Sequence, residues 1–397
     1  MRRLPIRAAM MVSLAATACA AQPATQPAAG TAEDRKLTRE ILERSLAAGT
    51  EFLVQAQQPA GNFIYELNFK NGELPQGDNQ VRQAGALWSL ALIHQYQPSE
   101  KVRGAVARGL DFFKRSSRLV RPGARLIAYP GDAAGRTGTM ALVILSLVDF
   151  LLSEGAIEGR EAYRKDLEEY VGFLLLLRLP GGQFQQQYDP KSGTGVGGPS
   201  PYYDGEALLA LARAAKYAGT SNLKDGILES ARRMRQAHVV EALAKHPDSN
   251  TTKGFFQWGV MAYHELVTSG WEGGLDFAPT AIELGRWMID VHRTLSRPLN
   301  TAYAQEGLIS AYEVARIAGD AGAQARFRHV IDVGLYKLTS WQVGGPLAHE
   351  NSYLQRNPQY VARARGGVMN SKADPMLRVD VTQHQMHAVI LALRFLY

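Results

Sequence analysis

Two acidic residues at the starts of alanine- and leucine-rich segments are the first candidates for chemistry. Asp204 and Glu306 each stand directly before a glycine, Gly205 and Gly307. Two carboxylates in one register could act as general acid and base if the fold turned both toward the same cleft. Asp at a helix start also satisfies free backbone N–H groups, so Asp204 could equally be a helix cap.

A second pair of candidates lies near the carboxyl end of the sequence. Asp380 and His384 are four residues apart and would share a helix face, where the carboxylate could orient the imidazole as a base or acid. Alternatively, Asp380 caps a helix and His384 is a hydrogen-bonded core histidine. His384 and His387 could face one metal ion, but two ligands without a third make a metal site improbable, and no cofactor is expected.

Glu206 follows Asp204 by two residues, so on a helix it points about 200° away and would have a different role. A first-turn acid is favoured by the helix dipole. Because an unpaired Glu is costly against apolar neighbours, Glu206 also stays a candidate for the site.

Cations and aromatic residues stand beside the same segment starts. The cations could attract a carboxylate or sulfate, and they are Arg82, Arg136, Lys253 and Arg378. The aromatic residues could stack on sugar rings, although each taken singly is better explained by packing; they are Tyr129, Tyr202, Tyr203, Trp258 and Tyr303.

These segment starts belong to a sixfold pattern. A polar residue, a glycine and a small-residue helix recur at 83–85, 136–138, 203–205, 257–259 and 305–307, and at 382–384 with His in place of Gly. The small-residue helices are expected over 80–95, 137–153, 203–217, 256–267, 301–317 and 379–395. Amphipathic helices precede them over 36–57, 99–117, 158–177, 222–239, 279–295 and 321–340.

Alternation of these two helix classes predicts the fold. Helices that are apolar nearly all round must be covered on most sides, whereas amphipathic helices keep one wet face. Six hairpins with an inner and an outer ring make an all-α (α/α)6 toroid, which we expect to be a single domain over 36–397. Long connections at 58–79, 180–201 and 342–378 precede inner helices, so one rim should carry the loops and the site.

The first residues predict export. Residues 1–20 combine a basic start, an apolar stretch and a small-residue cleavage site, and 21–35 reads as a flexible tether. The only cysteine, Cys19, could become a lipid anchor, but no Leu stands three residues before it, so simple export to the periplasm or exterior is preferred. No later segment is long and apolar enough for a transmembrane span.

Composition argues against nucleic acid as a partner. Loss of Arg2, Arg3 and Arg7 lowers the formal charge from +7 to +4, and no zinc-finger or RNA-binding motif is present. The oligomeric state has no signal in the sequence.

Local motifs add a resemblance. The turns at 55–63 and 179–184 look like the Gln-x-x-Gly-x-Phe turns of (α/α)6 toroids, and 202–211 looks like inner-helix segments of bacterial carbohydrate-processing toroids. The chain thus resembles six-hairpin glycosidases, unsaturated-uronyl hydrolases and uronyl C5-epimerases, which implies a substrate cleft at the rim. Terpenoid-cyclase-like toroids are a distant alternative, because the Asp-x-Asp-Asp motif and a cysteine outside residues 1–20 are both missing.

The leading hypothesis is an exported glycoside hydrolase acting on an oligo- or polysaccharide, including one with acidic sugars. Asp204 and Glu306 would be acid and base, with Asp380 and His384 as a supporting or alternative pair and Arg82 and Arg136 binding substrate. One alternative is a polysaccharide lyase or uronyl C5-epimerase, in which Tyr202 or Tyr203 and His384 move a proton. Another is a noncatalytic toroid that binds glycan or protein.

Overall fold

The computed structural model describes residues 36–155 and 157–397, and Lys36–Tyr397 form one compact unit. The expected signal peptide, the tether and Cys19 lie outside the described residues. Among the helices described, none has the length and apolar character needed to cross a membrane.

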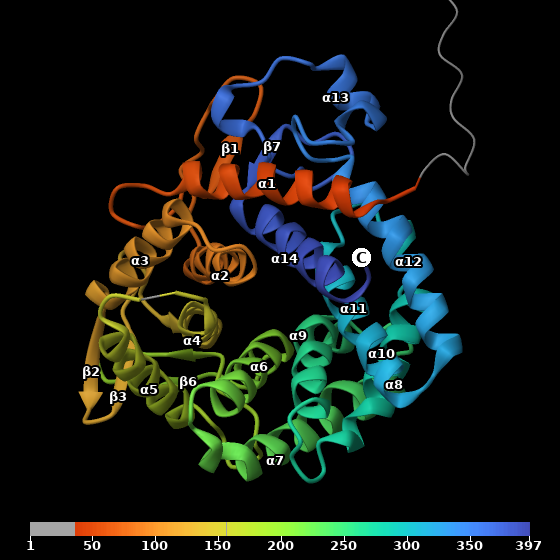
Figure 1. Ribbon diagram of the computed structural model, residues 1–397. Helices are drawn as coiled ribbons and strands as arrows, with labels where there is room; N and C mark the ends of the chain where they lie inside the picture. Colours follow the sequence, from red (N-terminus) through yellow and green to blue (C-terminus); the bar gives the residue numbers. More distant parts are fainter. Residues whose placement is uncertain (1–35, 156) are drawn as a thin grey trace, which may run out of the picture. The chain divides into compact units, whose positions relative to one another are not determined.

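In the described part of the chain, six amphipathic helices form the outer ring, which Figure 1 shows around the inner helices. In α3, for example, Ser99 caps the first turn and Val102, Val106 and Leu110 are buried on one face. The outer helices are α1 (Arg39–Ala56), α3 (Glu100–Arg115), α5 (Arg160–Leu176), α7 (Lys224–Arg235), α10 (Ala278–Asp290) and α12 (Ala321–Thr339). A π-helical turn (Gln236–Val240) and the short α8 (Glu241–Lys245) extend α7.

Six helices that are buried on most sides form the inner ring. They are α2 (Gln80–Tyr96), α4 (Thr137–Leu152), α6 (Pro201–Tyr217), α9 (Asn250–Val267), α11 (Ala302–Ala318) and α14 (Val379–Phe395). Each packs against the next, and α14 packs against α2, so the ring is closed. The predicted (α/α)6 toroid is therefore confirmed. The expected start of α9 at residue 256 is wrong, because this helix begins six residues earlier, at Asn250.

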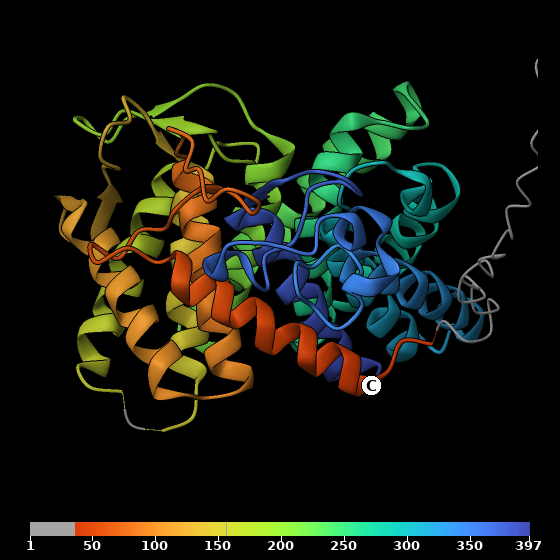
Figure 2. The same cartoon turned by 90° about the horizontal axis from the view of Figure 1, so that it is seen from above.

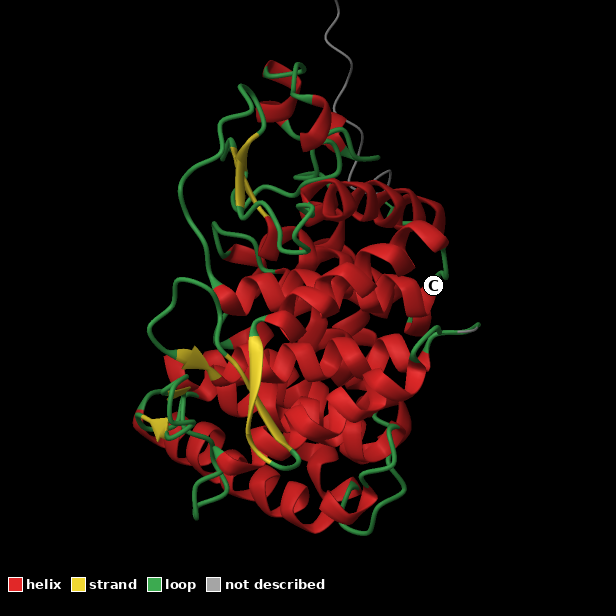
Figure 3. Cartoon of the chain, turned by 90° about the vertical axis from the view of Figure 1, so that its left-hand side faces the viewer, coloured by secondary structure: helices red, strands yellow, loops and turns green. Residues whose placement is uncertain are grey.

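Short antiparallel strands tie the long connections together. One pair joins β1 (Glu66–Asn68) to β7 (Met376–Arg378), and another joins β2 (Ser117–Arg121) to β3 (Ala124–Ile127). The third sheet has the order β4 (Gly135–Arg136), β5 (Gln187–Tyr188) and β6 (Gly195–Val196). The connections also contain α13 (Ser352–Arg356). Figure 3 shows these strands confined to loops around the packed helices.

The long connections gather at one rim because all six inner helices begin there. In Figure 2 the loops around β5 and β6 lie at the upper edge, and the short turn between α2 and α3 lies at the lower edge. Loops on a rigid helical frame can vary without disturbing the core, which makes this rim the place for a site.

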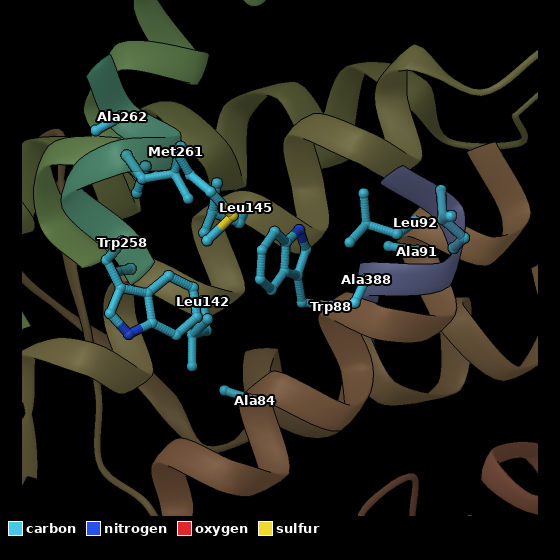
Figure 4. Packing of buried hydrophobic residues seen from close by; sticks show 14 of the residues in the cluster. Ala84, Trp88, Ala91, Leu92, Leu142, Leu145, Trp258, Met261, Ala262 and Ala388 are labelled. Carbon is cyan, nitrogen blue, oxygen red and sulfur yellow. The ribbon is translucent and has the colours of Figure 1, made fainter. Parts of the chain in front are cut away.

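Aromatic and small side chains fill the centre of the ring. Trp88 of α2 and Trp258 of α9 lie with ring centres 5.7 Å apart, and Ala84 and Ala388 allow the neighbouring helices to approach (Figure 4). The indole N–H of Trp88 donates to Asp149 Oδ2 at 2.7 Å. The middle of the toroid is therefore a packed core beneath the rim.

An ion network closes the opposite end of the inner ring. Arg213 of α6 pairs with Asp149 of α4 and with Glu265 of α9. Glu265 also accepts from Lys216 at 2.8 Å and from Tyr217 at 3.0 Å. Burial opposes ionisation of Glu265, but Arg213 and Lys216 together lower its pKa to about 2. These ion pairs thus connect three inner helices, α4, α6 and α9, at the end away from the rim.

Candidate active site

A cavity of about 390 Å³ lies at the rim where the inner helices begin. Its aromatic lining consists of Tyr202, Tyr203, Trp258 and Tyr303, all four of which were predicted as ligand-contacting residues. Its charged and titratable lining consists of Arg82, Glu206, Lys253, Arg378, Asp380 and His384. The cavity is therefore built from residues of α2, α6, α9, α11 and α14.

Glu206 is the most unusual carboxyl in the cavity wall. Its side chain is buried, and no described residue makes a hydrogen bond to Oε2. Burial raises its pKa to about 8. Gly138 of α4 provides the space, because a Cβ at that position would collide with Oε2 of Glu206 and with the Tyr203 ring. At neutral pH Glu206 is therefore a carboxylic acid that can donate a proton into the cavity.

His384 is held from behind by Glu306, which is fully buried. Its Nδ1 lies 3.1 Å from Glu306 Oε1, and His387 Nδ1 lies 3.3 Å from the same oxygen. Gln257 donates to the other oxygen, Oε2. Burial works against a charged imidazole, but the Glu306 carboxylate outweighs it and raises the pKa of His384. For Glu306 itself, burial favours the neutral acid, yet the two histidines lower its pKa.

The second ring nitrogen of His384 is left for a ligand. Among the described residues no hydrogen bond to Nε2 is formed, and a quarter of the side chain is exposed. When Nδ1–H donates to Glu306, a neutral imidazole presents the lone pair of Nε2 to the cavity. This arrangement suits a general base.

The four-residue spacing suggested that Asp380 would orient His384, but in the structure its carboxylate is engaged by two arginines. Its carboxylate accepts from Arg378, with Nε at 3.0 Å from Oδ1 and Nη2 at 2.7 Å from Oδ2. Arg82 Nε lies 3.2 Å from Oδ2. Two guanidinium groups therefore engage both oxygens, and Glu306 takes the place expected for Asp380 beside the imidazole.

Asp204 lies outside the cavity lining and has partners of its own. It accepts from the Phe184 N–H at 2.7 Å and from the Gln183 amide at 3.0 Å, and His238 Nε2 lies 2.6 Å from Oδ2. Glu306 is likewise absent from the lining, behind His384. The structure therefore does not bring Asp204 and Glu306 together as a facing pair of carboxylates.

Asp204 occupies a position that recurs around the ring. It is the fourth residue of α6, and the fourth residues of α2 and α14, Gln83 and Thr382, accept hydrogen bonds in the same way. The donors are the N–H groups of Phe63 at 2.7 Å, in the turn after α1, and of Val368 at 2.9 Å, in the long connection after α12, where Val368 forms a β-bridge with Gln342. We call this the anchor position, because it fixes the entering turn to the inner helix.

Arg136 is the remaining predicted ligand-binding residue, and it also lies outside the lining. It precedes α4, and its backbone N–H donates to Gln80 Oε1 at 3.0 Å. Arg82 and Arg378 do line the cavity, and the Arg82 guanidinium lies 5.5 Å from the centre of the Tyr65 ring.

Several lining residues were not predicted. Asn300 and Asn370 come from loops without any periodic signal, whereas Gln257 was visible as the polar residue of its repeat. Across residues 36–155 and 157–397, no group of three His, Cys, Asp or Glu side chains is placed to hold a metal ion.

The closed ring of six hairpins places the chain in the (α/α)6 toroid class, with a six-hairpin glycosidase-like fold. The chain matches no protein-family model, and no curated protein matches it by sequence.

Solved structures are nevertheless similar over most of the chain. A sugar epimerase from a ruminal bacterium has a TM-score of 0.63 at 10% identity, covering 90% of this chain and 99% of the other. An unsaturated glucuronyl hydrolase specific for heparin has a TM-score of 0.59 at 11% identity, covering 89% and 98%. Cellobiose 2-epimerase from Spirochaeta thermophila DSM 6192 has a TM-score of 0.59 at 15% identity, covering 90% and 96%. At such identities these similarities establish the fold alone.

Proposed function

We propose that this protein is a carbohydrate-active enzyme whose active site is the rim cavity and whose general acid is Glu206. The observation that carries the proposal is a buried, unpaired carboxyl in the wall of an aromatic-lined cavity, with its pKa raised to about 8. Paired groups whose environments separate their pKa values are typical of acid–base catalysis. The named activities of the similar toroids, which include a sugar epimerase and a glucuronyl hydrolase, support a saccharide substrate.

Glycoside hydrolysis is the first candidate reaction. Glu206 would protonate the oxygen of the leaving group, and His384 would accept a proton from the attacking water through Nε2. Glu306 would keep the imidazole oriented and stabilise the charge that it gains. The aromatic side chains Tyr202, Tyr203 and Trp258 would stack on the sugar rings.

Proton transfer at carbon, as in an epimerase or lyase, is the second candidate. One observation favours it: His384 presents an unengaged Nε2 into the cavity while Glu306 holds Nδ1. In both reactions His384 would remove the proton next to a carbonyl or carboxylate. In an epimerase, Glu206 or Tyr203 would return a proton to the other face of that carbon, whereas in a lyase it would protonate the oxygen that leaves the neighbouring carbon as the double bond forms.

One experiment separates these reactions. The protein is incubated with neutral and acidic oligosaccharides in D₂O, and the products are followed by proton NMR. Hydrolysis gives new reducing ends without deuterium at ring carbons. Epimerisation gives a new ring configuration with deuterium at the inverted carbon, and a lyase gives a vinylic proton and ultraviolet absorption.

Glu206→Gln tests the acid. We expect turnover to fall by about 10²- to 10⁴-fold, the usual contribution of a general acid. Glu313→Gln is the matched control, since Glu313 is a buried acid of an inner helix that pairs with Arg316 outside the cavity. Undiminished turnover in Glu206→Gln would refute the proposal. Saccharide binding without turnover by the wild-type protein would favour the noncatalytic toroid.

We also propose that the protein acts after export, in the periplasm or outside the cell. The sequence of residues 1–20 supports this proposal. Mass spectrometry of the mature protein tests it, because simple cleavage removes Cys19 and lipid anchoring leaves it as the modified first residue. An intact residue 1 in the mature protein would contradict export by this route.

A further inference from the structure

Three basic side chains, Arg82, Lys253 and Arg378, line the cavity, and two of them share one acid. Arg82 and Arg378 both pair with Asp380, and Arg378 does so through two hydrogen bonds. Asp380 therefore compensates one of these two positive charges. The guanidinium groups are also fixed in place by these contacts, which limits how far they can move toward a ligand.

Lys253 is the third cation, and none of the described acids pairs with it. Within residues 36–155 and 157–397, no carboxylate oxygen lies within the 4.0 Å that defines an ion pair with its Nζ. The ammonium instead lies 5.9 Å from the centre of the Tyr303 ring. Both residues line the cavity, so the charge of Lys253 is presented to whatever enters it.

Asp248 lies behind Tyr303, and both of its carboxylate oxygens already have partners. The Tyr303 hydroxyl lies 3.4 Å from His292 Nε2, and His292 Nδ1 lies 2.9 Å from Asp248 Oδ1. The other oxygen of Asp248 accepts from Arg297 at 3.1 Å. Asp248 thus orients the residues behind Tyr303 and leaves Lys253 uncompensated.

The early start of α9 brings Lys253 to this place. Ser249 caps the helix through the Thr252 N–H at 3.3 Å, so α9 begins seven residues, or about two turns, before Gln257, the polar residue of its repeat. Gly254 lies against the Tyr202 ring, where a Cβ would approach ring carbons to 2.8 Å. The first turn of α9 therefore stands beside the aromatic lining and carries Lys253 to the Tyr303 ring.

We propose that Lys253 binds an anionic group, a carboxylate or a sulfate ester, on the saccharide that occupies the cavity. The inference rests on the proposed function in one respect, that the cavity binds a saccharide. An ammonium without an internal partner in a partly enclosed site favours a ligand that brings the missing negative charge. Neutral sugars would leave Lys253 uncompensated, so the site discriminates against them.

Calorimetric binding to matched ligands tests this inference. One arm compares a galacturonate trisaccharide with its neutral methyl ester, and the other compares a sulfated trisaccharide with its unsulfated parent. The variants are Lys253→Met, Lys253→Arg and the control Lys245→Met, which removes an exposed lysine of the neighbouring α8. Binding is measured in the Glu206→Gln background as well, so that turnover does not deplete the ligand.

We expect the wild-type protein to bind a charged ligand more tightly than its neutral counterpart. Lys253→Met should weaken binding of the charged ligand at least about tenfold and leave the neutral one unchanged, Lys253→Arg should retain most of the affinity, and Lys245→Met should have no effect. If Lys253→Met weakens binding only in the galacturonate comparison, the anionic group is a carboxylate; if it does so only in the sulfated comparison, the group is a sulfate ester. Equal binding of charged and neutral ligands, unchanged binding in Lys253→Met, or no binding of any anionic ligand at millimolar concentration would overturn the inference.

Failure of this inference and failure of the proposed function give different results. Glu206-dependent turnover of neutral saccharides, without preference for anions, would refute the role of Lys253 and keep the enzyme assignment. Anion preference that depends on Lys253, together with full turnover in Glu206→Gln, would refute Glu206 as the general acid and keep the role of Lys253.

Discussion

Glu206→Gln should change how the stability of the protein depends on pH. The native carboxyl has a pKa of about 8, against the ordinary value of 4.5 in an unfolded chain. Between these values the native state keeps a proton that the unfolded chain has lost, so rising pH favours the unfolded state and the free energy of unfolding falls. The glutamine variant cannot ionise and should escape this loss.

The magnitude follows from the size of the shift. Each pKa unit corresponds to about 1.4 kcal/mol, so between pH 5 and pH 8 the free energy of unfolding of the wild type should fall by about 3 to 4 kcal/mol relative to the variant. The difference should level off above pH 8, where Glu206 is ionised in both states.

Denaturant unfolding at pH 5, 6, 7, 8 and 9 measures this difference. Glu40→Gln corrects for loss of one negative charge, since Glu40 is an exposed acid of α1. Infrared difference spectra between wild type and Glu206→Gln should show the carbonyl band of a protonated acid at pH 7 and lose it by about pH 9. A difference in unfolding free energy that stays flat with pH would show that Glu206 has a compensating partner, and the reasoning would fail.

Three further predictions concern the surrounding residues. Asp204→Ala removes the acceptor of the Phe184 N–H and should cost about 3 kcal/mol in denaturant unfolding, with kcat/KM of the folded protein unchanged; a large loss of kcat/KM would restore Asp204 to the site. Arg213→Met leaves Asp149 and Glu265 without their shared cation and should cost about 3 to 5 kcal/mol, against less than about 1 kcal/mol for Lys101→Met at an exposed pair; equal losses would contradict a buried network. The profile of kcat/KM should be bell-shaped: it should rise as His384, whose pKa is raised by Glu306, loses its proton, and fall near pH 8 as Glu206 ionises. Because the Glu306 carboxylate raises the pKa of His384, Glu306→Gln should shift the rising limb to lower pH, and an unmoved limb would exclude His384 as the base.

The sequence predicted the fold well because the inner helices are buried on nearly all sides. From Thr137 to Phe150 every residue of α4 is buried, so composition alone marks this segment as an inner helix. Local sequence patterns did not predict a helix turn made of polar residues or a strand pair formed by distant segments. The first turn of α9, beginning at Asn250, lacks apolar periodicity, and β1 pairs with β7 across most of the chain.

Part of the cavity lining was predicted, and the predicted carboxylates Asp204 and Glu306 lie outside it. Asp204 was singled out with Glu306 because each stands directly before a glycine, but Asp204 is the fourth residue of its helix, like Gln83 and Thr382, whereas Glu306 is the fifth residue of α11. The helical spacing did predict that Glu206 points away from Asp204, and the structure turns Glu206 to the cavity. The contact between Glu306 and His384 joins residues 78 positions apart, which no spacing rule within one helix can supply.

Ring closure by α14 has a consequence for the order of assembly. This helix lies between α2 and α11 and is covered by α1, yet it is synthesised after the five other inner helices. Until then the five earlier inner helices form an open arc, and the cavity lacks both Asp380 and His384. Chains that stop before Val379 should therefore expose the apolar faces of two unpaired inner helices and become targets for chaperones or proteases. Closure of the inner ring thus depends on the seventeen-residue helix α14.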